Sequence, residues 1–179
     1  MKATHNPYNP GAGVPPPELA GRDNLVDIAR VAIARAKGGR PAKSAIMLGL
    51  RGVGKTVLLN AFEAIAEEEG CQTALLEIDP GTPLAQQLAP QLQHILHRLD
   101  RVKKAGNEVQ KAFGALRSFA SMFKATVGDV DFGFAVTPAT GDLSIDLTDL
   151  FVAIAEAAKK RDTAVILLIG YRVFGVTNL

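Results

Sequence analysis

Apolar residues recur every three or four positions over several long stretches of the chain, which is the spacing of one buried helix face. Turn residues such as Gly38 and Gly70 close these stretches, because glycine readily ends a helix. The pattern predicts helices at Asn24 to Ala36, Leu58 to Glu69, Leu84 to Val102, Val109 to Phe123 and Asp149 to Arg161. The short link Ala105-Gly106-Asn107 predicts that the third and fourth form a helical hairpin.

Other runs of the chain have the pattern of strands. Three short, almost wholly apolar runs end at turn residues, as strands of a buried parallel sheet do: Ser44 to Leu48, Thr73 to Ile78 and Thr163 to Ile169. A period of two from Val130 to Val136, and again from Leu143 to Leu147, predicts a β-hairpin around residues 138 to 142. Strands that alternate with helices predict an α/β fold with helices flanking a parallel sheet.

The composition suits one domain. The chain has 179 residues, of which 47% are hydrophobic, enough to bury roughly 70% of the unfolded surface. A net charge of +2 excludes a strong global attraction to nucleic acid or anionic lipid. Cys71 is the only cysteine, which excludes an internal disulfide, and the apolar run Ala164 to Ile169 is too short to cross a membrane. We therefore expect a soluble cytoplasmic protein without a membrane partner.

One segment carries a specific chemical signal, GLRGVGKT, which fits the pattern GxxxxGK[ST] between a predicted strand and a predicted helix. Its glycines allow the backbone to curl so that successive N–H groups point at a phosphate chain. The lysine can reach the β- and γ-phosphates, and the threonine hydroxyl can ligate Mg²⁺. The predicted ligands of ATP and Mg²⁺ are Gly49, Leu50, Arg51, Gly52, Val53, Gly54, Lys55 and Thr56, with Thr56 as the metal ligand.

With three further segments, this loop resembles the AAA+ division of P-loop ATPases, in particular origin-recognition-like and STAND-like domains of bacteria and archaea. PELAGRD at residues 17 to 23 resembles the box before the nucleotide-binding core, LLEIDP the second strand and TAVILLI the Walker B strand. The resemblance implies an ATP-driven switch, with oligomers and a DNA or protein partner left open. It also implies that the residues Leu19, Ala20, Gly21 and Arg22 lie near the base or ribose; the alternative is a tight turn in which Asp23 caps a helix.

The sequence departs from the family pattern after Ile169, where Gly170-Tyr171 replaces the Asp-Glu pair that holds Mg²⁺ and orients water. Slow hydrolysis or none is therefore expected. Two explanations stay open: a truncated or frame-shifted product, and a domain that ends naturally and binds nucleotide without turning it over. The expected organisation is an extended Pro/Gly-rich arm at residues 1–17 and a partial nucleotide-binding domain at 18–179, with an insertion of helical hairpin and β-hairpin at 82–147.

Weaker candidates lie elsewhere. Glu77 and Asp79 end the second strand and are candidates to replace the missing acids, although an aspartate before Pro-Gly more often forms a turn. His94 and His97 lack companion ligands, which favours surface histidines over a metal site. A modest basic strip comprises Lys103, Lys104, Lys111, Arg117 and Lys124. The alternatives to an ATPase are a DNA-associated or signalling fragment that acts as a binding module and, ranked last, a small-molecule kinase.

Overall fold

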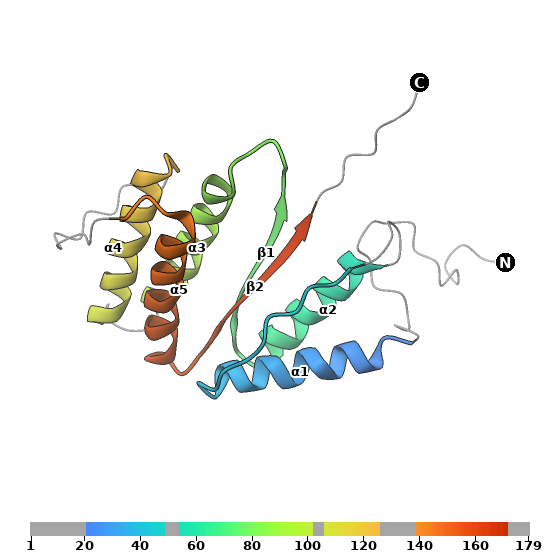
Figure 1. Ribbon diagram of the computed structural model, residues 1–179. Helices are drawn as coiled ribbons and strands as arrows, with labels where there is room; N and C mark the ends of the chain where they lie inside the picture. The colour runs from blue at the N-terminus through green and yellow to red at the C-terminus, as the bar shows by residue number, and fades with distance from the viewer. Residues whose placement is uncertain (1–20, 49–53, 102–105, 126–138, 172–179) are drawn as a thin grey trace, which may run out of the picture. The chain divides into compact units, whose positions relative to one another are not determined.

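Figure 1 shows the computed structural model, which describes residues 21–48, 54–101, 106–125 and 139–171. The chain divides into two units, residues 1–71 and 72–179, and each is described by itself. The first contains the helices α1 (Asp23–Lys37) and α2 (Lys55–Glu68). The second contains β1 (Gln72–Ile78), α3 (Leu84–Arg101), α4 (Asn107–Met122), α5 (Leu143–Lys159) and β2 (Val165–Tyr171).

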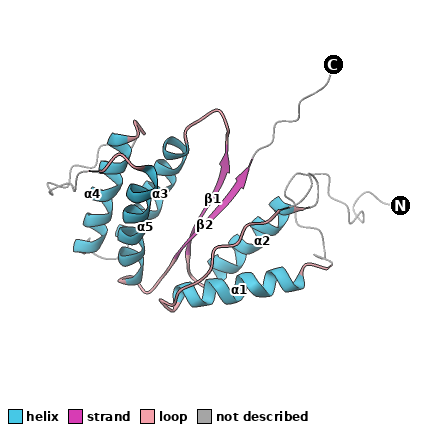
Figure 2. Ribbon diagram, viewed as in Figure 1, coloured by secondary structure: helices cyan, strands magenta, loops and turns pink. Residues whose placement is uncertain are grey.

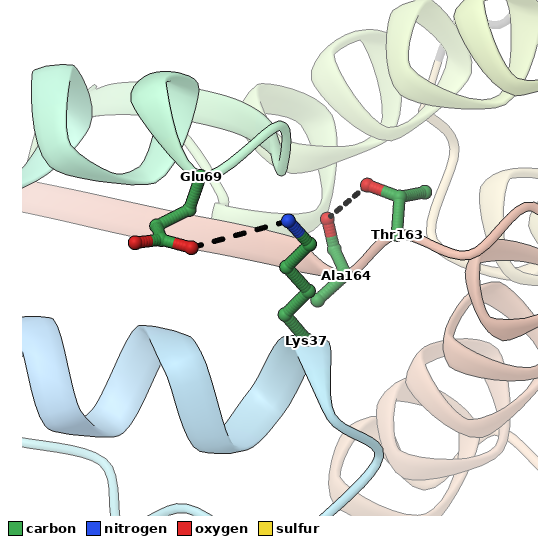
Figure 3. A network of polar contacts seen from close by, with 4 residues as sticks. All are labelled: Lys37, Glu69, Thr163 and Ala164. Atoms are coloured by element: carbon green, nitrogen blue, oxygen red, sulfur yellow. Dashed lines mark hydrogen bonds and ion pairs between the residues drawn. The ribbon is translucent and has the colours of Figure 1, made fainter.

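In the first unit, α1 and α2 pack against each other. Ile33 of α1 and the α2 residues Leu58 and Ile65 are buried. Beside the C-terminal end of α2, Glu69 Oε2 lies 3.9 Å from Nζ of Lys37, the last residue of α1 (Figure 3). Both side chains are more than a third exposed, so this ion pair contributes at most about 1 kcal/mol. The ion pair also shows that the C-terminal ends of α1 and α2 lie next to each other.

The predicted strand Ser44 to Leu48 is wrong for this structure: residues 41–48 have no regular secondary structure. Ile46 is 85% exposed and Leu48 is 89% exposed, although both are large and apolar. A strand needs a neighbouring strand to satisfy its backbone N–H and C=O groups. Among the described residues of this unit there is no other strand, so an apolar run that matches the strand pattern has nothing to pair with.

In the second unit, β1 and β2 form a parallel pair with a register that runs from Gln72 opposite Val165 to Ile78 opposite Tyr171. These strands confirm the predictions for Thr73 to Ile78 and Thr163 to Ile169 to within two residues. Two parallel strands require a crossover, and here the connection contains the three helices α3, α4 and α5. Figure 2 shows α3, α4 and α5 together on one side of the two strands.

The hydrophobic core of this unit joins those helices to the sheet. Ala74 and Leu76, alternate residues of β1, belong to one buried cluster with apolar side chains of all three helices. Its fully buried members include Leu92, Ile95, Leu96, Leu116, Phe119 and Leu150. The helices α3 and α4 occupy the two predicted helical ranges, and α4 also packs on α5. This core holds β1, which carries Glu77 next to its last residue and is followed directly by Asp79.

The predicted β-hairpin is wrong at its second strand, because residues 143–147 form the first turns of α5. The spacing of Leu143 and Leu147 fits a helix as well as a strand, and Leu150 and Ile154 continue the helical pattern into the core. Asp142 decides between the two, since its carboxylate caps the helix. The first predicted strand, 130–136, lies outside the described residues, and α5 runs through the insertion boundary predicted at residue 147.

Candidate functional site

The first turn of α2 carries the described part of the predicted phosphate loop. Gly54 is the N-cap residue, with φ 81° and ψ 22°, a left-handed conformation that glycine adopts without steric penalty. Its carbonyl oxygen accepts a hydrogen bond from the Leu58 N–H at 3.1 Å, which closes the first turn. Lys55 and Thr56 are then the first two helical residues, so α2 begins before the predicted start at Leu58. The remaining predicted ligands, Gly49 to Val53, lie outside the described residues.

The electrostatics of this helix end favour an anion. The first N–H groups of any α-helix have no partner within the helix, and the macrodipole adds about half a positive charge there. Gly54 has no side chain with which to cap them, and the first turn of α2 contains no acidic residue. The lysine charge of Lys55 adds to the same field. This end of α2 is therefore suited to a phosphate group.

Arg22 lies at the start of the other helix of this unit. It is the N-cap residue of α1, preceded by Gly21 at φ 73°. The Arg22 carbonyl oxygen accepts hydrogen bonds from the N–H groups of Leu25 at 2.9 Å and Val26 at 3.1 Å. Gly21 lies in a turn, as the alternative predicted, but Asp23 is the first helical residue and not the cap, so that part of the alternative is wrong. Leu19 and Ala20 lie outside the described residues.

The helix pair brings Arg22 and Lys55 to the same end of the first unit. The helices α1 and α2 have nearly equal lengths, 15 and 14 residues, and Lys37 meets Glu69 at their C-terminal ends. Because the helices also pack together, their N-terminal ends point the same way (Figure 1). The positive ends of the two macrodipoles therefore point the same way, and a cationic residue stands at each of them.

The carboxylates predicted at the end of β1 have different surroundings. Glu77 is exposed and lies opposite Gly170 in the sheet register. Asp79 forms a turn: Oδ1 accepts from the Gly81 N–H at 3.1 Å, and Oδ2 accepts from the Thr82 hydroxyl at 3.3 Å. These bonds match the turn-forming alternative for Asp79. A catalytic role for either carboxylate stays a prediction.

Gln87 holds the same turn from α3, and the sequence pattern gave no sign of it. Its Oε1 accepts from the Asp79 N–H at 2.8 Å, while Nε2 donates to the carbonyl oxygens of Asp79 at 3.0 Å and Thr82 at 2.7 Å. The amide side chain thus serves both as acceptor and as donor to the backbone between β1 and α3. The one sequence feature related to this contact is that Gln87 is a polar residue in the first turn of α3.

Gly170 and Tyr171 belong to β2, opposite Glu77 and Ile78, so the strand ends without an acidic residue. The departure from the Walker B pattern therefore falls within the strand itself. Strand β2 has the sequence VILLIGY and therefore carries no acidic residue that could replace the missing pair. The nearest acidic residues along the paired strand are Glu77 and, in the turn, Asp79.

The other polar candidates do not form a site. Within the described residues there is no group of three or more His, Cys, Asp or Glu side chains that could hold a metal. The His97 ring packs against Phe113 with centroids 5.1 Å apart, and His94 is exposed. The basic residues Lys111, Arg117 and Lys124 are exposed, whereas Lys103 and Lys104 lie outside the described residues.

The fold and the comparisons now define the class of protein. A mixed helix and strand fold with a small parallel sheet is compatible with an α/β P-loop architecture. The family model described as an AAA ATPase domain matches residues 18–170. The chain therefore belongs to the AAA ATPase domain family, as its resemblance predicted. Comparison with curated proteins and with solved structures gave no match. Among the described helices, none has the length and apolar character needed to cross a membrane.

Proposed function

We propose that this chain binds ATP with Mg²⁺ through the segment GLRGVGKT, as the AAA ATPase domain family implies. The observation that carries the proposal is the left-handed Gly54 followed at once by a helix that opens with Lys55 and Thr56. A helix N-terminus preceded by such a glycine directs backbone N–H groups at an anion, and the lysine supplies a mobile positive charge.

Each ligand has a separate role in this proposal. The backbone from Gly49 to Gly54 surrounds the phosphate chain, and Lys55 neutralises charge on the β- and γ-phosphates. The Thr56 hydroxyl holds Mg²⁺, a hard cation that prefers oxygen ligands. Arg22 faces the base or ribose from the N-terminal end of α1, which points the same way as the N-terminal end of α2.

We further propose that the chain hydrolyses bound ATP much more slowly than an active ATPase does. Hydrolysis needs one carboxylate for the Mg²⁺ shell and one group to orient the attacking water. The end of β2 offers Gly170 and Tyr171 in their place. The Asp79 carboxylate accepts hydrogen bonds within its own turn, which makes Glu77 the better candidate for any residual turnover.

The test is calorimetric titration of ATP and Mg²⁺ into the wild-type chain and into Lys55→Ala. Removing a charge-assisted contact should weaken ATP binding by about tenfold to a hundredfold. Lys159→Ala is the matched control, because it removes the same charge from the exposed end of α5 and should leave the affinity unchanged. Equal affinities for the wild type and Lys55→Ala would overturn the proposal. A parallel assay of ADP release separates binding from turnover.

A further inference from the structure

The exposed face of α1 carries two large apolar side chains next to each other. Ile28 is 52% exposed and Val31 is 60% exposed, and residues three apart in a helix are neighbours on its surface. Ile33, which lies about 200° further around the helix than Val31, is buried. The first unit therefore packs one side of α1 and leaves an apolar patch on the other side in contact with water.

Two opposite charges flank this patch. Asp27 lies four residues before Val31 and Arg35 four residues after it. Each is therefore displaced from Val31 by about 40° around the helix and by about 6 Å along it. Both residues are exposed, and neither forms an ion pair within the described residues. The exposed face of α1 thus has a negative end, an apolar centre and a positive end.

The Arg35 side chain is already held at one point. Its Nε donates to the Pro41 carbonyl oxygen at 3.0 Å. A guanidinium has five N–H donors, so the four donors of its two terminal nitrogens can still bind a carboxylate in a bidentate manner. A side chain that is fixed at one atom loses less conformational freedom when it binds a second group. Arg35 is therefore suited to an ion pair with a carboxylate from outside the chain.

We propose that α1 pairs antiparallel with α1 of a second copy of the chain, through the face formed by Asp27, Ile28, Val31 and Arg35. A two-fold axis beside Val31 places every residue level with the residue that lies equally far beyond Val31 in the other copy. Asp27 of each copy then lies level with Arg35 of the other copy. Ile28 lies level with Ala34, whose small side chain leaves room for it.

The charges select a second copy as the occupant, because the face is complementary to itself in one orientation only. In a parallel pair, Asp27 would lie beside Asp27 and Arg35 beside Arg35, which like-charge repulsion disfavours. One helix face buries less than the roughly 1,000 Å² of a stable interface, so we expect the pair to form only at high protein concentration. This inference goes beyond nucleotide binding and does not depend on it.

Sedimentation velocity of the full chain over a concentration series tests the proposal. Asp27→Arg and Arg35→Asp should each need a concentration about tenfold higher than the wild type to dimerise, because like charges then meet twice across the axis. Arg30→Asp is the matched control for Arg35→Asp, since it makes the same charge change at an exposed position of α1 about 100° from Val31. It should sediment like the wild type. A wild-type chain that stays monomeric up to about 1 mM would overturn the proposal.

An equimolar mixture of Asp27→Arg and Arg35→Asp identifies the contact. In a mixed pair, a face with two basic residues meets a face with two acidic residues, so the mixture should associate at a concentration about tenfold below that of either variant alone. A mixture that sediments as the sum of its two components would refute the proposal.

Val31→Ser replaces either charge variant that circular dichroism shows to be unfolded. It removes the apolar centre of the face and should raise the concentration needed for dimerisation about tenfold. Dimerisation of Val31→Ser at the same concentration as the wild type would also contradict the proposal.

Discussion

The N-terminal ends of α2 and α5 both carry the positive end of a helix dipole, but the residues that cap them differ in charge. At α5, Asp142 Oδ1 accepts from the N–H groups of Ser144 at 2.8 Å and Ile145 at 3.1 Å. A second carboxylate, that of Asp146, is also in the first turn. At α2, the cap is Gly54, and the first turn has a lysine and no acid. The chain thus neutralises one helix end with its own carboxylates and gives the other a charge that suits a bound anion.

The second carboxylate, that of Asp146, is bonded to the residues just before the cap of α5. Its side chain is buried, and Oδ1 accepts from the Thr140 N–H at 2.8 Å and hydroxyl at 2.9 Å. Oδ2 accepts from the Gly141 N–H at 2.9 Å. The backbone hydrogen bond from Thr140 is the largest cause of a lowered pKa for Asp146, partly offset by desolvation. The comparison suggests that carboxylates, where the chain uses them at a helix end, serve the fold.

The largest expected effect comes from making the α2 end resemble the α5 end. Thr56→Asp places a carboxylate in the first turn of α2, where it should repel the phosphates while suiting the macrodipole. We expect a loss of ATP affinity of about a hundredfold or more by calorimetry. Thr56→Ser keeps the hydroxyl and should bind ATP like the wild type. A Thr56→Asp variant that still binds ATP tightly would argue against a nucleotide at this helix end.

A smaller effect should follow from changing the cap residue. Gly54→Ala forces a side chain into a left-handed conformation and should lower the free energy of unfolding by about 1–2 kcal/mol. Among the residues that the structure describes, no heavy atom lies within 4 Å of a Cβ added at Gly54, so the expected cost is backbone strain. Gly114→Ala, also in open space but inside α4, should instead stabilise the chain by about 0.5–1 kcal/mol. Urea unfolding of both variants checks the contrast in sign.

The smallest effect is a dependence of stability on pH at the α5 end. Because the pKa of Asp146 is lower in the folded chain than its ordinary value of 3.8, its ionised form stabilises the fold. That stabilisation is complete above the ordinary pKa and is lost as the pH falls through the folded pKa. Urea unfolding at several pH values below 5 should show a weaker acid dependence for Asp146→Asn than for the wild type. An unchanged dependence would mean that other carboxylates govern acid unfolding.

The sequence correctly predicted the elements that depend mainly on residues within the element itself. Thr73 to Ile78 and Thr163 to Ile169 are apolar runs that become strands, and the helix predicted after the GLRGVGKT segment is present as α2. Ser44 to Leu48 fails because pairing depends on a distant strand, which no local pattern contains. Residues 143–147 fail because their spacing fits two periods and only the cap at Asp142 distinguishes them.

The contacts that position the backbone could not have been predicted in the same way. Gln87 meets a turn eight residues earlier, and Arg98 meets a strand residue 25 positions away. Neither partner is a side chain, so no complementary pair of charges or ligands appears in the sequence. The folding of α3 beside β1 creates both contacts, and only a structure of that unit shows them. The motif residues 49–53 remain a prediction from the sequence, outside the described residues.

Gln87 and Arg98 of α3 contact the backbone near the two ends of β1, so the distance between them along the helix has to match the length of the strand. Eleven residues make three helical turns to within about 20°, so both side chains leave the helix in nearly one direction. Inserting a single residue between them would rotate one by about 100° and release one end of the strand. An insertion of seven residues would restore the direction but overshoot the strand by about 10 Å. Variation in the length of this segment should therefore be tolerated far less than variation in the connection between α4 and α5.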